Sequence, residues 1–175
     1  MESAISQLAE EEKRMYMAED LIEFHRRAHH SLEKLLAHCR QLSAEELNQE
    51  LAGFGYPTVR LQLHHGIGAE KYWIGVLQGR IDVDDDDPDY PTIESLEKYR
   101  QIVFSATEKY LRTASENELN TPRPMMTWGN KEKVLIPAQV LIRTQTHLYQ
   151  HQGQIVAMCR LLGKPIGPGM DYPIT

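Results

Sequence analysis

Two histidines four residues apart, His147 and His151, are the side chains whose type and spacing most directly suggest chemistry. On a helix, side chains four apart share one face, with Cβ atoms about 6 Å apart, so two imidazoles can bind one metal ion. The alternative is a pair of core histidines held by hydrogen bonds, because an unpaired buried ring nitrogen costs about 1–3 kcal/mol. Spacing alone leaves both interpretations open, since His25 and His29 have the same spacing in a segment rich in Arg and Glu.

Four long helical segments must position these histidines. Glycine and proline interrupt the chain at 53–57, 79–91, 122–124 and 163–165. Between these breaks, apolar residues recur every three or four positions, as in amphipathic helices. The stripes begin at Met17, Leu61, Leu96 and Val140 and end at Leu36, Val76, Leu111 and Leu162. We therefore predict an all-α chain, a four-helix bundle, forming one domain over residues 1–175.

Local signals predict where some of these elements begin. Ser43 and Glu46 form a capping-box pattern, which predicts a short helix after Ser43. Thr92 is expected to cap the third long helix. Residues 124–137 fit the helical pattern least. Their apolar residues flank Gly129–Asn130, which indicates either a β-hairpin or an ordered loop.

A third histidine comes from the second helical segment, which contains both His64 and His65. His65 shares a face with apolar residues, so we expect it rather than His64 to point to the interior, and Gly68 is expected to leave space beside it. His147 and His151 lie on a stripe that also points inward. Three histidines from two helices leave at least one coordination position open, which is typical of catalytic rather than structural metal sites.

Two anchors carry a family resemblance. The first is His65, Glu70 and Trp73 in the second segment, and the second is the run from His147 to Gln154. The Leu-Leu-Gly sequence at 161–163 and the closing Asp-Tyr-Pro-Ile at 171–174 agree with both. On these residues the chain resembles the DinB/YfiT-like superfamily of four-helix-bundle metalloproteins over nearly its whole length.

The resemblance implies a DinB-like up-down-down-up topology with a long crossover between the second and third helices. It also implies a divalent metal held by His65, His147 and His151, with His64 excluded. Many members have histidine or arginine where this chain has Gln152, but that position is not a ligand. Three imidazoles suit Zn, Ni, Fe or Co, and intrinsic affinities do not decide among these metals in a cell.

Three functions are compatible with such a site. The resemblance favours a thiol-dependent S-transferase whose metal holds the thiolate of a low-molecular-weight thiol beside a second small-molecule substrate. The alternatives are a hydrolase that activates water and a non-catalytic metal-binding or sensing bundle. Glu70 is a candidate base, or a hydrogen-bond partner of a ligand. Arg143, one turn before His147, is the candidate substrate-binding cation.

Composition limits the partners. The net charge of −6 without a Lys/Arg stripe argues against a nucleic-acid binder. No apolar run approaches the roughly 20 residues that span a bilayer, and the N-terminus lacks the apolar core of a signal peptide. Cys39 and Cys159 form no CxxC motif and are expected to be buried, reduced thiols. We expect a cytoplasmic protein with no membrane partner, and the resemblance suggests a homodimer.

Overall fold

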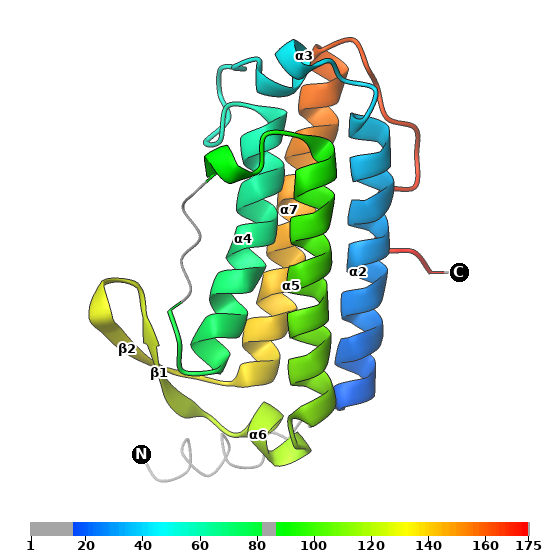
Figure 1. Cartoon of the computed structure of the whole chain (residues 1–175). Coiled ribbons are helices and arrows are strands. Elements are labelled where there is room, and N and C mark those ends of the chain that lie inside the picture. Colours follow the sequence, from blue (N-terminus) through cyan, green and yellow to red (C-terminus); the bar gives the residue numbers. More distant parts are fainter. Residues whose placement is uncertain (1–15, 82–86, 175) are drawn as a thin grey trace, which may run out of the picture.

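Four long helices lie side by side and form the body of the molecule (Figure 1). The computed structural model describes residues 16–81 and 87–174, so the segment on which the signal-peptide prediction rests lies outside the described residues. The helices are α2 (Ala18–Cys39), α4 (Val59–Leu77), α5 (Ile93–Thr113) and α7 (Pro137–Leu161). Helices α2 and α7 run in one direction, and α4 and α5 run in the other (Figure 1). The prediction of a mainly helical chain is confirmed.

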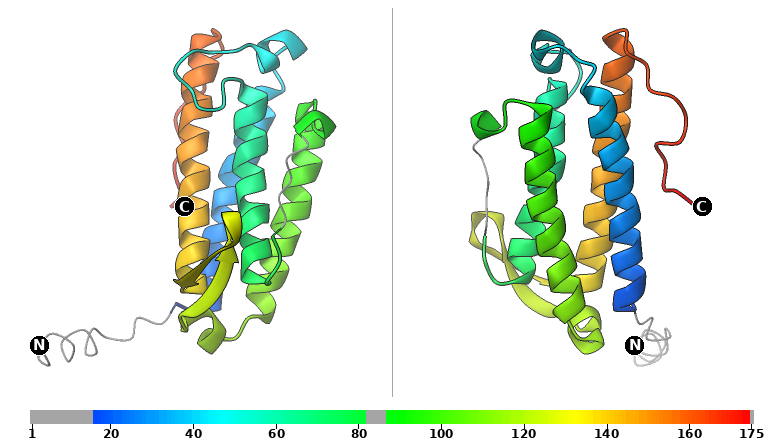
Figure 2. Two further views of the ribbon diagram at one scale, coloured as in Figure 1. Left: turned by 90° about the vertical axis from the view of Figure 1, so that its left-hand side faces the viewer. Right: turned by 45° about the vertical axis from the view of Figure 1, so that its right-hand side comes forward.

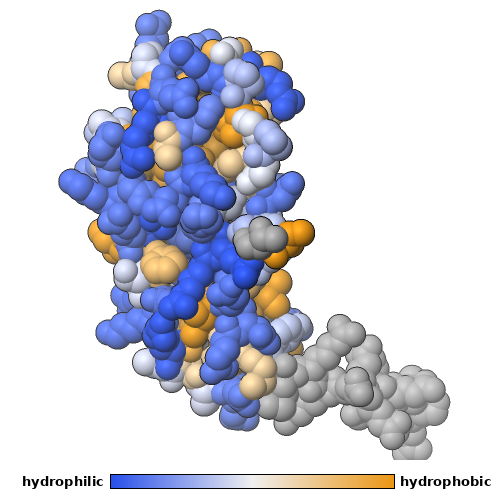
Figure 3. All heavy atoms as spheres, turned by 90° about the vertical axis from the view of Figure 1, so that its right-hand side faces the viewer, coloured by the Kyte–Doolittle hydropathy of each residue, from blue (hydrophilic) through white to orange (hydrophobic). Residues whose placement is uncertain are grey.

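The order of packing places α4 next to α7. Helix α4 contacts α5 and α7, and α2 contacts the same two helices from the other side. One cluster of buried apolar residues includes Leu36, Leu63 and Met158, and a second includes Leu77 and Leu111. The outward side of the bundle, seen from the right of Figure 1, is mostly hydrophilic with scattered apolar groups (Figure 3). Burial of the apolar faces between the helices therefore holds the bundle together.

The predicted helix starts are confirmed. Short helix α3 (Ala44–Asn48) begins after Ser43, whose side chain accepts from the Glu46 backbone amide while the Glu46 side chain accepts from Ser43. Helix α5 begins after Thr92, which forms a second capping box with Ser95. These side chains satisfy backbone amides that the first turn of a helix leaves without partners. The short helix α6 (Glu116–Asn120) follows α5.

Residues 124–137 adopt the hairpin rather than the loop. Strand β1 (Arg123–Thr127) pairs antiparallel with β2 (Lys131–Leu135), and the turn between them contains the 3-10 segment η2 (Trp128–Asn130). Gly129 and Asn130 have φ values of 65° and 53°, in the left-handed region that tight hairpin turns require. The hairpin lies across one end of α4 and α7 (Figure 2, left). A further 3-10 segment, η1 (Asp87–Asp89), precedes α5.

Two further sequence predictions concern the cysteines and the absence of membrane-spanning helices. Cys39 and Cys159 are buried free thiols, as predicted. Across the described residues, none of the helices combines the length and apolar character needed to cross a membrane.

Candidate metal centre

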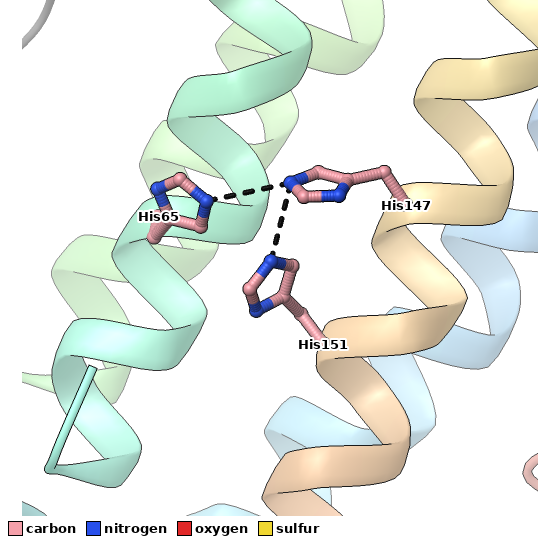
Figure 4. A group of neighbouring side chains, drawn as sticks. All are labelled: His65, His147 and His151. Carbon is pink, nitrogen blue, oxygen red and sulfur yellow. Dashed lines mark hydrogen bonds between the residues drawn. The ribbon is translucent and has the colours of Figure 1, made fainter. Parts of the chain in front are cut away.

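His65 on α4 faces His147 and His151 on α7, and the three imidazoles converge in the space between the two helices (Figure 4). Nε2 of His147 lies 3.4 Å from Nε2 of His65 and 3.1 Å from Nε2 of His151. With metal–nitrogen bonds of about 2.0–2.1 Å, the donors of a tetrahedral site lie about 3.3–3.4 Å apart. The observed separations are therefore those of ligand atoms that can share one ion.

Gln62, which the sequence analysis did not identify, determines the tautomer of His151. Its Oε1 atom lies 2.6 Å from Nδ1 of His151. Its amide nitrogen donates to Oε1 of Gln154 at 2.7 Å and to the carbonyl of Tyr56 at 3.0 Å, so Oε1 must be the acceptor toward the imidazole. Nδ1 of His151 then carries the proton, and the Nε2 lone pair faces the other two histidines.

Burial keeps the three imidazoles neutral. Burial, together with the neighbouring imidazoles, lowers the pKa of His65 and of His151 to about 4. The pKa of His147 is also lowered, first by burial and then by the charge of Arg143. A metal binds the neutral form of imidazole, so at pH 7 the lone pairs are available. In the described part of the chain, no carboxylate joins this group of three donors.

Two other residues shape the site. The ring of Tyr56 stacks on His65 with centroids 3.9 Å apart, and burial raises the pKa of its phenol. A Cβ atom at Gly66 would lie 3.4 Å from Cδ1 of Leu148, in van der Waals contact, so Gly66 is on the face of α4 that packs against α7. Gly68, which is expected to leave space beside His65, meets a different neighbour. Gly68 faces the Tyr99 hydroxyl, 3.4 Å from where its Cβ would lie, on the α5 side of the helix.

The reason given for preferring His65 over His64 also needs correction. His64 is the buried one of the two and packs against the rings of Tyr90 and Tyr99. His65 is half-buried and faces α7. Helix α4 is covered by α5 on one side and by α7 on another, so it has two buried faces. A single apolar stripe could not decide which face holds the metal ligands.

Glu70 does not lie among the three imidazoles. Its Oε1 atom is 2.9 Å from Nε2 of His25 and 2.6 Å from the Thr107 hydroxyl, and its Oε2 atom is 2.8 Å from Nε2 of His29. Glu70 is therefore not positioned to accept a hydrogen bond from His65 or to act as a base at the three imidazoles, the two roles for which the sequence analysis made it a candidate. Five residues correspond to about 140° around a helix axis, so Glu70 and His65 point to different neighbours.

His25, His29 and Glu70 also place nitrogen and oxygen atoms close enough for a metal, and all three are buried. Their hydrogen bonds point to a different role. Nη1 of Arg100 donates toward Nδ1 of His29 at 3.5 Å, so His29 carries its proton on Nε2 and donates it to Glu70. Electrostatic attraction to His29 and His25, and then the hydrogen bonds from both, hold the pKa of Glu70 well below its usual value despite burial. This group is a buried polar network that joins α2, α4 and α5.

Arg143, the predicted substrate-binding cation, is on the same side of the molecule as the three imidazoles. Its guanidinium lies over the ring of Trp73, 5.2 Å from the centroid. Its charge also lowers the pKa of His147. Gln152 is buried away from this side, where its Oε1 atom accepts from the Ser31 hydroxyl.

Comparisons with known proteins give a family match and a structural match. The model of the DinB family matches residues 15–175. Among solved structures, the chain is similar to a DinB family member from Shewanella denitrificans, with 17% sequence identity and a TM-score of 0.60. The match covers 91% of this chain and 90% of that one, and at this identity it concerns the fold. A search of curated proteins finds no match.

Proposed function

Because the chain belongs to the DinB family and brings three neutral imidazoles together, we propose that it is a divalent-metal-dependent enzyme, and specifically a thiol-dependent S-transferase. The proposal includes one DinB-like domain over residues 1–175, a four-helix bundle with up-down-down-up order. His65, His147 and His151 would hold Zn, Ni, Fe or Co. The convergence of three ring nitrogens at 3.1 and 3.4 Å is the observation that carries the proposal.

A metal bound by three neutral imidazoles would lower the pKa of a thiol or water in its open position and stabilise the anion that forms. The protein's own residues prepare this position. Gln62 orients His151, and Tyr56 covers one face of His65. Since the ligands carry no negative charge, the whole charge of the ion remains available to an anionic fourth ligand.

The engagement of Glu70 by other residues favours a thiol over water as that ligand. A hydrolase commonly uses a carboxylate to take the proton of the attacking water, but Glu70 is held by His25, His29 and Thr107. A thiol has a lower intrinsic pKa of about 8.5 and needs less assistance to ionise. Arg143 adds a positive charge that suits an anionic substrate near His147.

The experiment is a titration of the Co(II)-substituted protein with cysteine or glutathione. Thiolate binding is expected to change the visible absorption and to introduce a sulfur-to-cobalt charge-transfer band. A site that responds to azide or acetate but not to thiols would instead support the hydrolase. A site that responds to none of these would overturn the enzymatic proposal and leave a structural or sensing role for the metal.

A further inference from the structure

A cavity of about 470 Å³ lies between the end of α4, the start of α7 and the hairpin. Its apolar wall includes Trp73 from α4, Trp128 from the hairpin turn, Ile136 just before α7 and Val140 from α7. The rings of Trp73 and Trp128 meet edge to face, with centroids 5.5 Å apart. A volume of this size and an aromatic lining are typical of sites for small organic molecules, which generally range over about 300–1,000 Å³.

The cavity lies beside the three imidazoles along the same pair of helices. Arg143 lines the cavity and precedes His147 by four residues, which is about 6 Å along a helix. Trp73 follows His65 by eight residues, or about 12 Å. Since α4 and α7 run in opposite directions (Figure 1), Arg143 and Trp73 both lie toward the hairpin end. A small molecule beside Arg143 would therefore lie about one helical turn from His147, on the hairpin side of the three imidazoles.

Two cations line this apolar space, Lys133 from β2 and Arg143 from α7. Within residues 16–81 and 87–174, neither has a carboxylate oxygen within 4.0 Å, although most arginines of the same region form such pairs. Arg143 instead covers the Trp73 ring. Two cations without acidic partners, set in an aromatic wall, complement a ligand with an apolar body and a negative end.

We propose that this cavity binds a small aromatic or aliphatic carboxylate, whose body packs on Trp73 and Trp128 and whose carboxylate pairs with Arg143 and Lys133. This inference rests on the proposed function in one respect, since it makes this molecule the second substrate of the metal centre. The binding step itself requires only residues that lie outside the three metal ligands.

The chain contains two tryptophans, and both line the cavity, so their fluorescence reports directly on its occupation. We would titrate the metal-free protein with 3-phenylpropionate and with its neutral amide. The acid is expected to change the emission at lower concentrations than the amide, by about tenfold, which corresponds to about 1.4 kcal/mol. Arg143→Gln should remove most of this preference, and Lys133→Gln should reduce it.

Lys131→Gln is the matched control, because Lys131 lies on the same strand but does not line the cavity. It should retain binding within about twofold, inside the range expected for a remote surface charge. Equal binding of acid and amide, or no change in tryptophan emission with either, would overturn the proposal. So would equal weakening by Lys131→Gln and Arg143→Gln.

A titration of the His147→Ala/His151→Ala variant separates this inference from the proposed function. Acid binding should persist there without metal, whatever the cobalt experiment shows about thiols. Loss of acid binding in this variant, with its helical circular dichroism intact, would mean that the carboxylate binds at the imidazoles and would overturn the assignment to the cavity.

Discussion

Oε1 of Gln62 accepts a hydrogen bond from Nδ1 of His151 at 2.6 Å, and this bond turns Nε2 of the same ring toward His65 and His147. Replacing Gln62 with leucine removes the acceptor but keeps a similar volume. We expect metal affinity to fall about 10–100-fold, as is typical when the hydrogen-bond partner of a ligand is lost. Competition with a chelator measures the change.

The control for this substitution is Gln154→Leu. Gln154 contacts Gln62 rather than the imidazole, so its loss should weaken metal binding less. Equal effects of the two substitutions would show that the Gln62–His151 bond does not orient the ligand.

Removing any one ligand should deplete the metal. His65→Ala, His147→Ala and His151→Ala should each greatly reduce the metal content of protein purified without added metal or a histidine tag, measured by elemental analysis. Two remaining imidazoles leave too few protein donors for tight binding. His30→Ala, at an exposed position, should retain the metal. Loss from His64→Ala but not from His65→Ala would reverse the assignment on α4.

Glu70 should affect stability and not metal content. Removing one partner from a buried charged network typically costs about 3–5 kcal/mol, so Glu70→Ala should lower the free energy of unfolding by about that amount. Glu108→Ala should cost less than about 1 kcal/mol, because the Glu108–Arg26 pair is near the surface. Urea denaturation measures both. Metal loss from a folded Glu70→Gln protein would show that Glu70 contributes to metal binding after all.

The metal-free protein should lose stability as the pH falls from about 6.5 toward 4. The pKa of His65 and of His151 is lowered to about 4 in the folded chain, so the unfolded chain binds protons first in this window. The lowered pKa of buried His29 acts in the same direction. Denaturation midpoints at several pH values measure the slope.

His151→Gln should make this slope shallower, because it removes one of the groups whose pKa is lowered on folding. Stability that is independent of pH between 6.5 and 4.5 would contradict the neutral state of the imidazoles in the folded chain. Glu70 acts in a separate, lower window, since its lowered pKa stabilises the folded chain above about 4.5 and this contribution is lost as the pH falls further.

The sequence was sufficient for features that depend on residues close together in the chain. The four-residue spacing of His147 and His151 places both on one side of α7, because helix geometry is local. The caps at Ser43 and Thr92 depend on side chains within three residues of the backbone amides that they satisfy. Local turn chemistry at Gly129–Asn130 similarly allowed a hairpin, although it did not exclude a loop.

Only the tertiary structure decided which residues meet across helices. His65 reaches His147 over 82 positions of sequence, and Gln62 reaches His151 over 89. Glu70 could be separated from His65 by helix geometry alone, but its partners His25 and His29 depend on how α2 packs against the bundle. Helix α4 is buried on two sides, so its apolar pattern does not indicate which neighbouring helix each of its polar residues faces. The packing of the four helices determines those neighbours.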